Sequence, residues 1–300
     1  MKIVSLLPSA TEIVYALGLG DELAGVTFEC DFPPDARNKA IVSGTALPTD
    51  RPLGAREIDE AVSATVGSGK PIYTLDAERI RAIAPDLILA QDLCEVCAVP
   101  SGAVEDALDV LGCRADVLSL DPASLDEVIA CLGTVGEYTG AAARAVTLMD
   151  ELRGRVQRVR DAVAGAPRPK TLALEWSDPP FTGGHWVPDM IVAAGGEAVL
   201  APPGVPSRRL VWSEVGATAI DVVMFMPCGY HLPQARDEGR RLLARPELDG
   251  AAVYALDATS YFSRPGPRLV DGVELLASLL HADADVRHPT NAGALLRDKA

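Results

Sequence analysis

The chain has 300 residues, of which 48% are hydrophobic and 23% are charged, a composition typical of a folded globular protein of about two domains. Its net charge of −15 argues against binding to nucleic acid or to an anionic membrane surface, because proteins that bind these anionic surfaces need a surplus of lysine and arginine. No apolar run approaches the roughly 20 residues that a membrane-spanning helix needs, so we do not expect the protein to be embedded in a bilayer.

The first twenty residues have the apolar character of an export signal but lack its other features. Glu12 interrupts the apolar stretch, and no small-residue cleavage site follows it. We interpret residues 3–7 as a strand, and Ser9 with Glu12 as a capping box that starts a helix ending at Gly18. The chain is therefore expected to begin within its fold, and the predicted location is the cytosol.

Short apolar runs alternate with helical patterns through the first part of the chain. This alternation is typical of a mainly parallel sheet covered by helices, and it predicts an N-terminal α/β lobe over residues 1–123. After the first strand and helix, the expected strands are 23–27, 71–75, 86–90 and 114–119, and the expected helices are 76–84 and 102–111.

The pattern changes to helical spacing over residues 124–166, which we expect to form a connecting segment. Gly133, Gly136 and Gly140 favour a break between two helices, the second of them spanning about residues 141–164. The alternation then returns and predicts a C-terminal lobe over residues 167–300. Its expected strands are 171–176, 221–226 and 252–256, and its expected helices are 186–194, 233–244 and 268–281. The tail after residue 281 has no strong pattern, so we expect it to lie on the surface or to fray.

Ligand sites in open α/β sheets lie in the loops that follow the strands. Those loops are rich here in aromatic, cysteine and histidine residues, and nine of the fourteen aromatic residues lie after residue 175. Flat rings suit a flat and weakly polar ligand. The candidate ligand-binding residues are Glu29, Cys30, Asp92, Cys94, Cys97, Trp176, Phe181, His185, Trp186, Trp212, Tyr230, Tyr261, Phe262 and Arg264.

The spacing of Cys94 and Cys97 leaves three interpretations open: a metal site, a redox dithiol, or small buried thiols. Histidine and cysteine in the other loops would complete a metal site if the loops converge, and His185 would either coordinate a metal or donate a hydrogen bond. The candidate metal ligands are Cys30, Cys94, Cys97, His185 and Cys228, with His231 as a further possibility. The sequence lacks the common motifs for phosphate binding, serine hydrolysis, zinc proteolysis and dinucleotide binding, so no catalytic residue is predicted.

Four segments of the chain resemble the cobalamin-binding and iron-complex-binding proteins of ABC importers. Residues 4–18 resemble the opening strand and helix of that family, and residues 83–89 resemble one of its strands. Residues 178–183 and 264–268 resemble two loops of its second lobe. The resemblance implies an α/β fold of two Rossmann-like lobes that are joined by a long backbone helix, with a ligand cleft between the lobes.

The resemblance also implies a function, namely non-catalytic binding of a corrinoid similar to cobalamin, for transport or salvage. It implies an ABC permease as partner, with Glu105 as one contact. Members of the family are usually periplasmic or lipid-anchored, which differs from the cytosolic location predicted above. The alternatives are a binder of haem or of a siderophore-type chelate, and a metal-binding protein or metalloenzyme that uses the cysteine and histidine residues.

Overall fold

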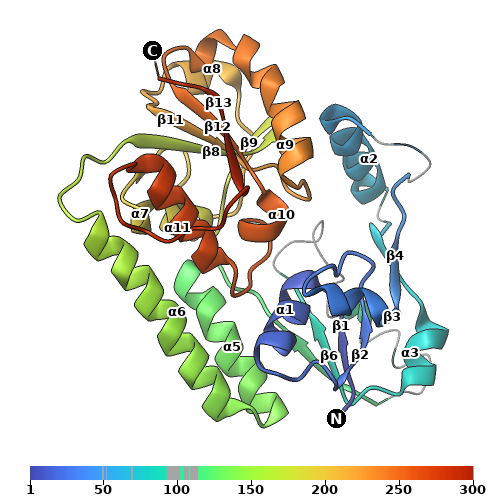
Figure 1. Ribbon diagram of the computed structural model, residues 1–300. Coiled ribbons are helices and arrows are strands. Elements are labelled where there is room, and N and C mark those ends of the chain that lie inside the picture. Colours follow the sequence, from blue (N-terminus) through green and yellow to red (C-terminus); the bar gives the residue numbers. More distant parts are fainter. Residues whose placement is uncertain are drawn as a thin grey trace. The chain divides into compact units, whose positions relative to one another are not determined.

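A computed structural model describes residues 1–48, 51, 53–68, 70–92, 102–104, 108 and 114–299 (Figure 1). The chain divides into two compact units. Unit 1 comprises residues 1–121 and 130–147, and unit 2 comprises residues 122–129 and 148–300. The predicted α/β class with two lobes is confirmed.

Unit 1 is built on a five-stranded parallel sheet with the strand order β3-β2-β1-β6-β7. Its two central strands, β1 and β6, are buried along their whole length, as expected of strands that helices cover on both faces. The strands are β1 (Ile3–Ser5), β2 (Leu23–Val26), β3 (Ala40–Ile41), β6 (Leu87–Ala90) and β7 (Asp116–Ser119). The helices of this unit include α1 (Pro8–Ala16), the 3-10 helix η1 (Pro34–Asn38), α2 (Ala55–Gly67) and α3 (Ala77–Ile83).

Two sequence predictions for unit 1 are wrong. Helix α1 begins at Pro8 with Leu7 as its N-cap and no side-chain cap, so Ser9 and Glu12 form no capping box. Proline suits the first helical position because its missing N–H would have no partner there. The strand predicted at 71–75 does not join the parallel sheet: β5 (Tyr73–Leu75) pairs antiparallel with β4 (Ser43–Thr45) in a separate two-stranded sheet. The helix predicted at 102–111 lies largely outside the described residues.

Two helices, α5 (Leu125–Thr139) and α6 (Ala142–Ala162), follow β7. The predicted break between them is confirmed: Gly140 has a φ of +75°, a left-handed conformation that glycine adopts without a steric penalty. Each helix contributes residues to both units. None of the helices in the described ranges combines the length and the apolar character that a bilayer crossing requires.

Unit 2 contains a six-stranded mixed sheet with the order β10-β8-β11-β12-β13, and β9 pairs with β8. Its strands are β8 (Lys170–Ser177), β9 (Pro180–Thr182), β10 (Glu197–Ala198), β11 (Val222–Phe225), β12 (Ala252–Leu256) and β13 (Gly293–Arg297). The tail was predicted to lie on the surface or to fray. Its residues 293–297 form β13, which pairs antiparallel with β12 and closes one edge of the sheet.

Alternate residues of the unit 2 strands form one core beneath α8 (Trp212–Gly216), α9 (Leu232–Gly239) and the 3-10 helices η2 (Arg240–Ala244) and η3 (Pro246–Leu248). The strand members of this core are Leu172, Leu174, Val223, Phe225 and Val253. Helices α7 (Val187–Ala193) and α11 (Leu269–Leu280) pack together on the opposite face of the sheet, and the short α10 (Ala258–Tyr261) follows β12 (Figure 1). The helix predicted at 233–244 is α9 followed by η2. Helices thus cover both faces of the unit 2 sheet, so a ligand would be contacted by the segments at the ends of the strands.

Candidate functional site

Three segments at the carboxyl edge of the unit 2 sheet contact one another, namely the end of β8, the loop after β11 and the start of α10. Strands β8, β11 and β12 are parallel neighbours, so each of them delivers its following loop to the same edge. The rings of Trp176 and Tyr230 meet edge to face, with centroids 5.6 Å apart. The Thr259 N–H donates a hydrogen bond of 3.1 Å to the Tyr230 carbonyl, which ties the start of α10 to the loop after β11. The structure therefore brings together Trp176 and Tyr230, two of the predicted site residues.

A histidine and an aspartate from the segments after β11 and β12 contact each other. His231 directly follows Tyr230, and its Nδ1 lies 3.2 Å and 3.3 Å from the two carboxylate oxygens of Asp257. Asp257 also caps α10 by accepting the Ser260 N–H over 3.0 Å, so its carboxylate is held in place from two sides. We call Trp176, Tyr230, His231 and Asp257 the edge cluster. Asp257 was not among the predicted site residues, although its position directly after β12 was a signal for it.

Tyr230 is the titratable aromatic residue of the edge cluster. Burial raises the pKa of its phenol, and the nearby negative charge of Glu238 adds to this shift. Glu238 itself accepts a hydrogen bond of 2.7 Å from the Ser177 hydroxyl. The phenol therefore stays protonated at neutral pH, and the edge cluster offers an apolar ring surface with a polar rim.

His185 and Trp186 form a second group, which hydrogen bonds to the segment of residues 204–207. The Trp186 indole N–H donates to the Phe262 carbonyl over 2.8 Å, and both of these side chains are buried. His185 has a φ of +51°, and its N–H donates to the Val205 carbonyl over 2.7 Å. Its Nε2 is buried and finds no hydrogen-bond partner among the described residues. Burial lowers the pKa of this imidazole.

Glycine is required next to this group. A Cβ on Gly184 would lie 2.2 Å from the backbone nitrogen of Ser207, so only glycine lets the two segments approach so closely. His185 is thus held by backbone contacts on a strained turn. Ligand contact by His185, Trp186 and Phe262 stays a prediction.

Three other predicted aromatic residues each have an arginine over the ring. The guanidinium carbons of Arg209, Arg245 and Arg268 lie 5.5, 4.4 and 5.8 Å from the ring centroids of Phe181, Trp212 and Tyr261, respectively. Trp212 packs on the unit 2 core, whereas Phe181 in β9, Tyr261 at the end of α10 and Arg264 in the loop after it are half-buried. Phe181 lies opposite Trp176 in the pairing of β9 with β8, and ligand contact by Phe181, Trp212, Tyr261 and Arg264 stays a prediction.

The predicted site residues of unit 1 lie at the ends of β2 and β6. The Tyr73 hydroxyl lies 3.4 Å from a carboxylate oxygen of Glu29, and the Asp92 N–H donates to Asp121 over 2.5 Å. Cys30 is buried, with its sulfur 3.0 Å from the Thr11 hydroxyl. The sequence analysis missed two exposed aromatic residues of the loop after β2, which are Phe28, 39% exposed, and Phe32, 42% exposed.

The predicted metal site has no support among the described residues. No group of three or more histidine, cysteine, aspartate or glutamate side chains in the described ranges is arranged to hold a metal ion. Cys30 lies in unit 1 and Cys228, which is exposed, lies in unit 2. Cys94 and Cys97 lie outside the described residues, as does Glu105.

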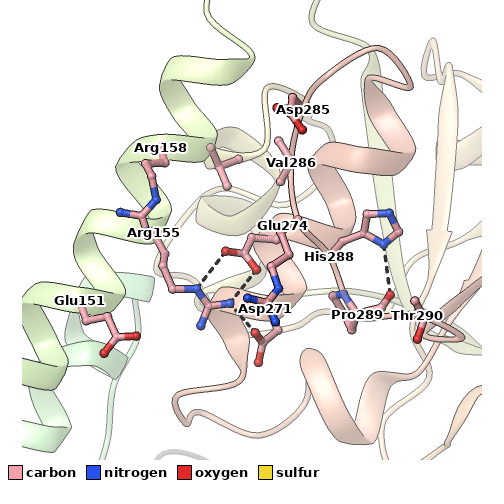
Figure 2. A pocket seen from close by; sticks show the side chains of 12 residues that line it. Glu151, Arg155, Arg158, Asp271, Glu274, Asp285, Val286, His288, Pro289 and Thr290 are labelled. Carbon is pink, nitrogen blue, oxygen red and sulfur yellow. Dashed lines mark hydrogen bonds and ion pairs between the residues drawn. The ribbon is translucent and has the colours of Figure 1, made fainter.

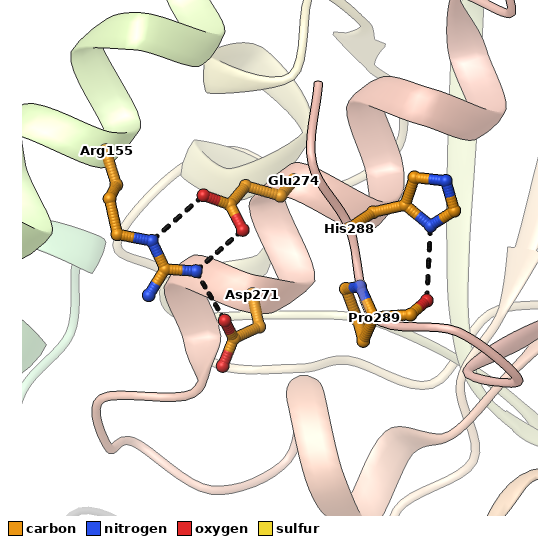
Figure 3. A network of polar contacts seen from close by, with 5 residues as sticks. All are labelled: Arg155, Asp271, Glu274, His288 and Pro289. Atoms are coloured by element: carbon orange, nitrogen blue, oxygen red, sulfur yellow. Dashed lines mark hydrogen bonds and ion pairs between the residues drawn. The ribbon is translucent and has the colours of Figure 1, made fainter. Parts of the chain in front are cut away.

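A cavity of about 900 Å³ in unit 2 contains none of the predicted site residues. Figure 2 shows Arg155 reaching from α6 toward Asp271 and Glu274 on α11, with His288 on the far side. Arg155 donates to Glu274 over 2.9 Å and 2.6 Å and also to Asp271 (Figure 3). The Glu274 carboxylate raises the pKa of the Arg155 guanidinium, so the charge is permanent. These groups satisfy one another, and the network therefore fastens α6 to α11.

Comparison with known proteins gives consistent matches along the chain. A family model described as periplasmic binding protein matches residues 3–251. A vitamin B12-binding protein of Yersinia pestis is 28% identical over 272 residues, which are 90% of this chain and 82% of the relative.

Two solved structures have the same fold. A periplasmic haem-binding protein from Pseudomonas aeruginosa has a TM-score of 0.72 at 20% identity, covering 100% of this chain and 99% of its own. A periplasmic vitamin B12-binding protein of Vibrio cholerae has a TM-score of 0.63 at 23% identity, covering 94% of this chain and 96% of its own. At these identities the likeness shows the fold and leaves the ligand open.

Proposed function

Because the chain belongs to the periplasmic binding protein family, we propose that it is a non-catalytic binder of a corrinoid similar to cobalamin. The observation that carries the proposal is the edge cluster, where aromatic rings and polar groups from separate segments of the chain come together at the carboxyl edge of the unit 2 sheet. A corrinoid presents a broad, flat macrocycle with polar substituents around its rim. Rings with polar tips, such as those of Trp176 and Tyr230, match both features of that ligand.

The curated relatives support a corrinoid over other chelates. The match to a vitamin B12-binding protein of Yersinia pestis extends over 90% of this chain, and it is closer in sequence than either solved structure. Haem or a siderophore-type chelate is the second candidate, because the fold is also that of a haem-binding protein. Both candidates are flat or compact metal chelates, and a binding assay separates them.

The unit 1 candidates are proposed as further ligand contacts. Phe28 and Phe32 expose apolar ring surface in the loop that also carries Glu29. Exposed rings of this kind gain about 25 cal/mol for each Å² of apolar surface that a ligand covers. We therefore add Phe28 and Phe32 to the predicted set.

Titration of the purified full chain with cyanocobalamin, haemin and a ferric hydroxamate siderophore tests the proposal, with calorimetry as the readout. We expect cyanocobalamin to bind one-to-one with a Kd below about 10 µM and the other two to bind at least about 10-fold more weakly. Tighter binding of haemin or of the siderophore would move the function to that chelate. If the protein bound none of the three ligands, the proposed function would be overturned.

Delivery of the ligand to an ABC permease is part of the same proposal, and it rests on the family alone. Glu105, the predicted permease contact, lies outside the described residues. The cytosolic location also stays a prediction. Fractionation of cells that express the full chain tests it, and recovery from the periplasm or a membrane fraction would contradict it.

A further inference from the structure

A nearly buried carboxylate beside the end of β8 holds an exposed arginine. The Ser177 hydroxyl donates to one carboxylate oxygen of Glu238 over 2.7 Å, and a guanidinium nitrogen of Arg241 lies 3.0 Å from the other. Ser177 is buried, and it directly follows Trp176, whose ring meets that of Tyr230. A continuous chain of contacts therefore leads from the carboxyl edge of the unit 2 sheet to Arg241.

The charge of Arg241 also acts on the rings of the edge cluster. Burial raises the pKa of the Tyr230 phenol, and of the two charged groups that act on it, Glu238 adds to this shift whereas Arg241 opposes it. Both charges thus lie within electrostatic reach of the phenol. The ring centroids of Trp176 and Tyr230 are 5.6 Å apart, so a flat ligand that covers both rings brings its rim close to Arg241.

Glu238 and Arg241 differ in exposure and in what each has left to bind. The Glu238 side chain is 10% exposed and both of its oxygens have a partner, as a nearly buried carboxylate requires. The Arg241 side chain is 72% exposed, and in the part of the chain that the structure describes Glu238 is its one partner. A guanidinium has five N–H donors in a planar fork that matches a phosphate group, so most donors of Arg241 are left for a ligand.

We propose that Arg241 binds an anionic phosphate on the rim of the bound corrinoid, an inference that rests on the proposed function. A complete corrinoid has one such phosphate in the loop that joins the macrocycle to its nucleotide base, whereas a corrinoid without that loop has none. The net charge of −15 disfavours an anionic ligand in general, so the phosphate needs a fixed cation next to the rings. Glu238 is the positioning residue, and the protein selects complete corrinoids.

Two probes that differ only in a phosphate provide the test. Dicyanocobinamide lacks the phosphate, and dicyanocobinamide phosphate carries it. In calorimetric titrations of the full chain we expect the phosphate form to bind about 10-fold more tightly, because an arginine–phosphate contact is a charge-assisted hydrogen bond. We expect this gain to shrink in about 1 M salt, which screens an exposed ion pair.

Two variants and a control then assign the contact. Arg241→Gln removes the gain and leaves the affinity for dicyanocobinamide unchanged. Glu238→Gln keeps the shape of the side chain but removes the charge that orients Arg241, so the gain falls to about 3-fold. Arg240→Gln is the matched control and keeps the full gain, because Arg240 is exposed and pairs with Asp237 over 2.8 Å. Circular dichroism checks that each variant is folded.

The outcomes separate this inference from the proposed function. If wild type binds both cobinamides equally, or if the gain survives in Arg241→Gln, the phosphate contact is overturned and corrinoid binding is left intact. Equal weakening of both probes by Arg241→Gln would make the residue merely structural and would also overturn the inference, as would loss of the gain in Arg240→Gln. Failure of both cobinamides and of cyanocobalamin to bind overturns the proposed function itself.

Discussion

Removing the Arg155 guanidinium is expected to destabilise unit 2. In the Arg155→Met variant the aliphatic stem remains, but Glu274 loses two hydrogen bonds and Asp271 loses one. Glu274 is a buried residue, so its carboxylate is left largely buried without its counter-charge. The change therefore tests the network of Figure 3 and leaves the packing of α6 nearly unchanged.

The magnitude follows from how exposed the pair is. Breaking a fully buried ion pair costs about 3–5 kcal/mol, and breaking an exposed pair costs about 0–1 kcal/mol. The side chains of Arg155 and Glu274 are 22% and 11% exposed, between these limits, so we expect a loss of about 2 kcal/mol in the free energy of unfolding. With a urea m-value of about 2 kcal/mol/M, the midpoint falls by about 1 M.

Urea unfolding followed by far-UV circular dichroism measures this shift. Arg158→Met is the matched control, since Arg158 lies one turn away on the same helix and is exposed, and it is expected to cost less than about 0.5 kcal/mol. If the two variants lost equal stability, the network of Arg155 with α11 would not stabilise the unit as argued.

Three more outcomes are expected. Trp176→Ala lowers corrinoid affinity about 10-fold in calorimetry, whereas Tyr138→Ala, which removes an exposed ring on α5, has no effect on affinity. Equal affinities of the two variants would show that Trp176 is not part of the site. Gly184→Ala lowers the free energy of unfolding by about 2 kcal/mol or more, because the new Cβ would lie 2.2 Å from the backbone nitrogen of Ser207. Gly154→Ala on α6 is the control and raises the free energy of unfolding by about 1 kcal/mol. An unchanged stability of Gly184→Ala would contradict the close approach of the backbone at Gly184 and Ser207. Burial lowers the pKa of His185, so the unfolded chain takes up a proton near pH 6.5 that the folded chain does not, and stability is lost as the pH falls through about 6.5. Denaturant midpoints between pH 7.5 and 5.5 should fall more steeply for wild type than for His185→Gln, and parallel profiles would contradict this.

The fold was largely predictable because the strands and helices of both units have strong periodic patterns. The break at Gly140 was visible for the same reason, since glycine weakens a helix and favours a left-handed end. The prediction of a capping box at Ser9 was wrong. Helix α1 already begins at Pro8, so Ser9 lies inside the helix and cannot be its N-cap. Strand β13 was missed because the sequence 293–297 has no alternation, and its pairing with β12 depends on the folded sheet.

The candidate site was predictable only in part. That Trp176 and Tyr230 would meet follows from the rule that parallel strands end at one edge. Asp257 was missed because the sequence does not reveal that β12 lies next to β11, which is what brings this carboxylate to His231. Conversely, Phe262 and Trp186 have the residue types of a ligand site, but both are buried and the Trp186 indole N–H donates to the Phe262 carbonyl, which the sequence does not reveal.

Hydrogen exchange with and without cyanocobalamin tests the central claim most directly, because it locates the ligand without altering any residue. The account predicts slower exchange in the strand-end loops at 27–33, 176–186, 226–232 and 257–264, with no change at 285–290 beside the cavity of Figure 2. Protection confined to residues 151–159 and 285–290 would place the ligand in that cavity and contradict a site at the carboxyl edge of the sheet.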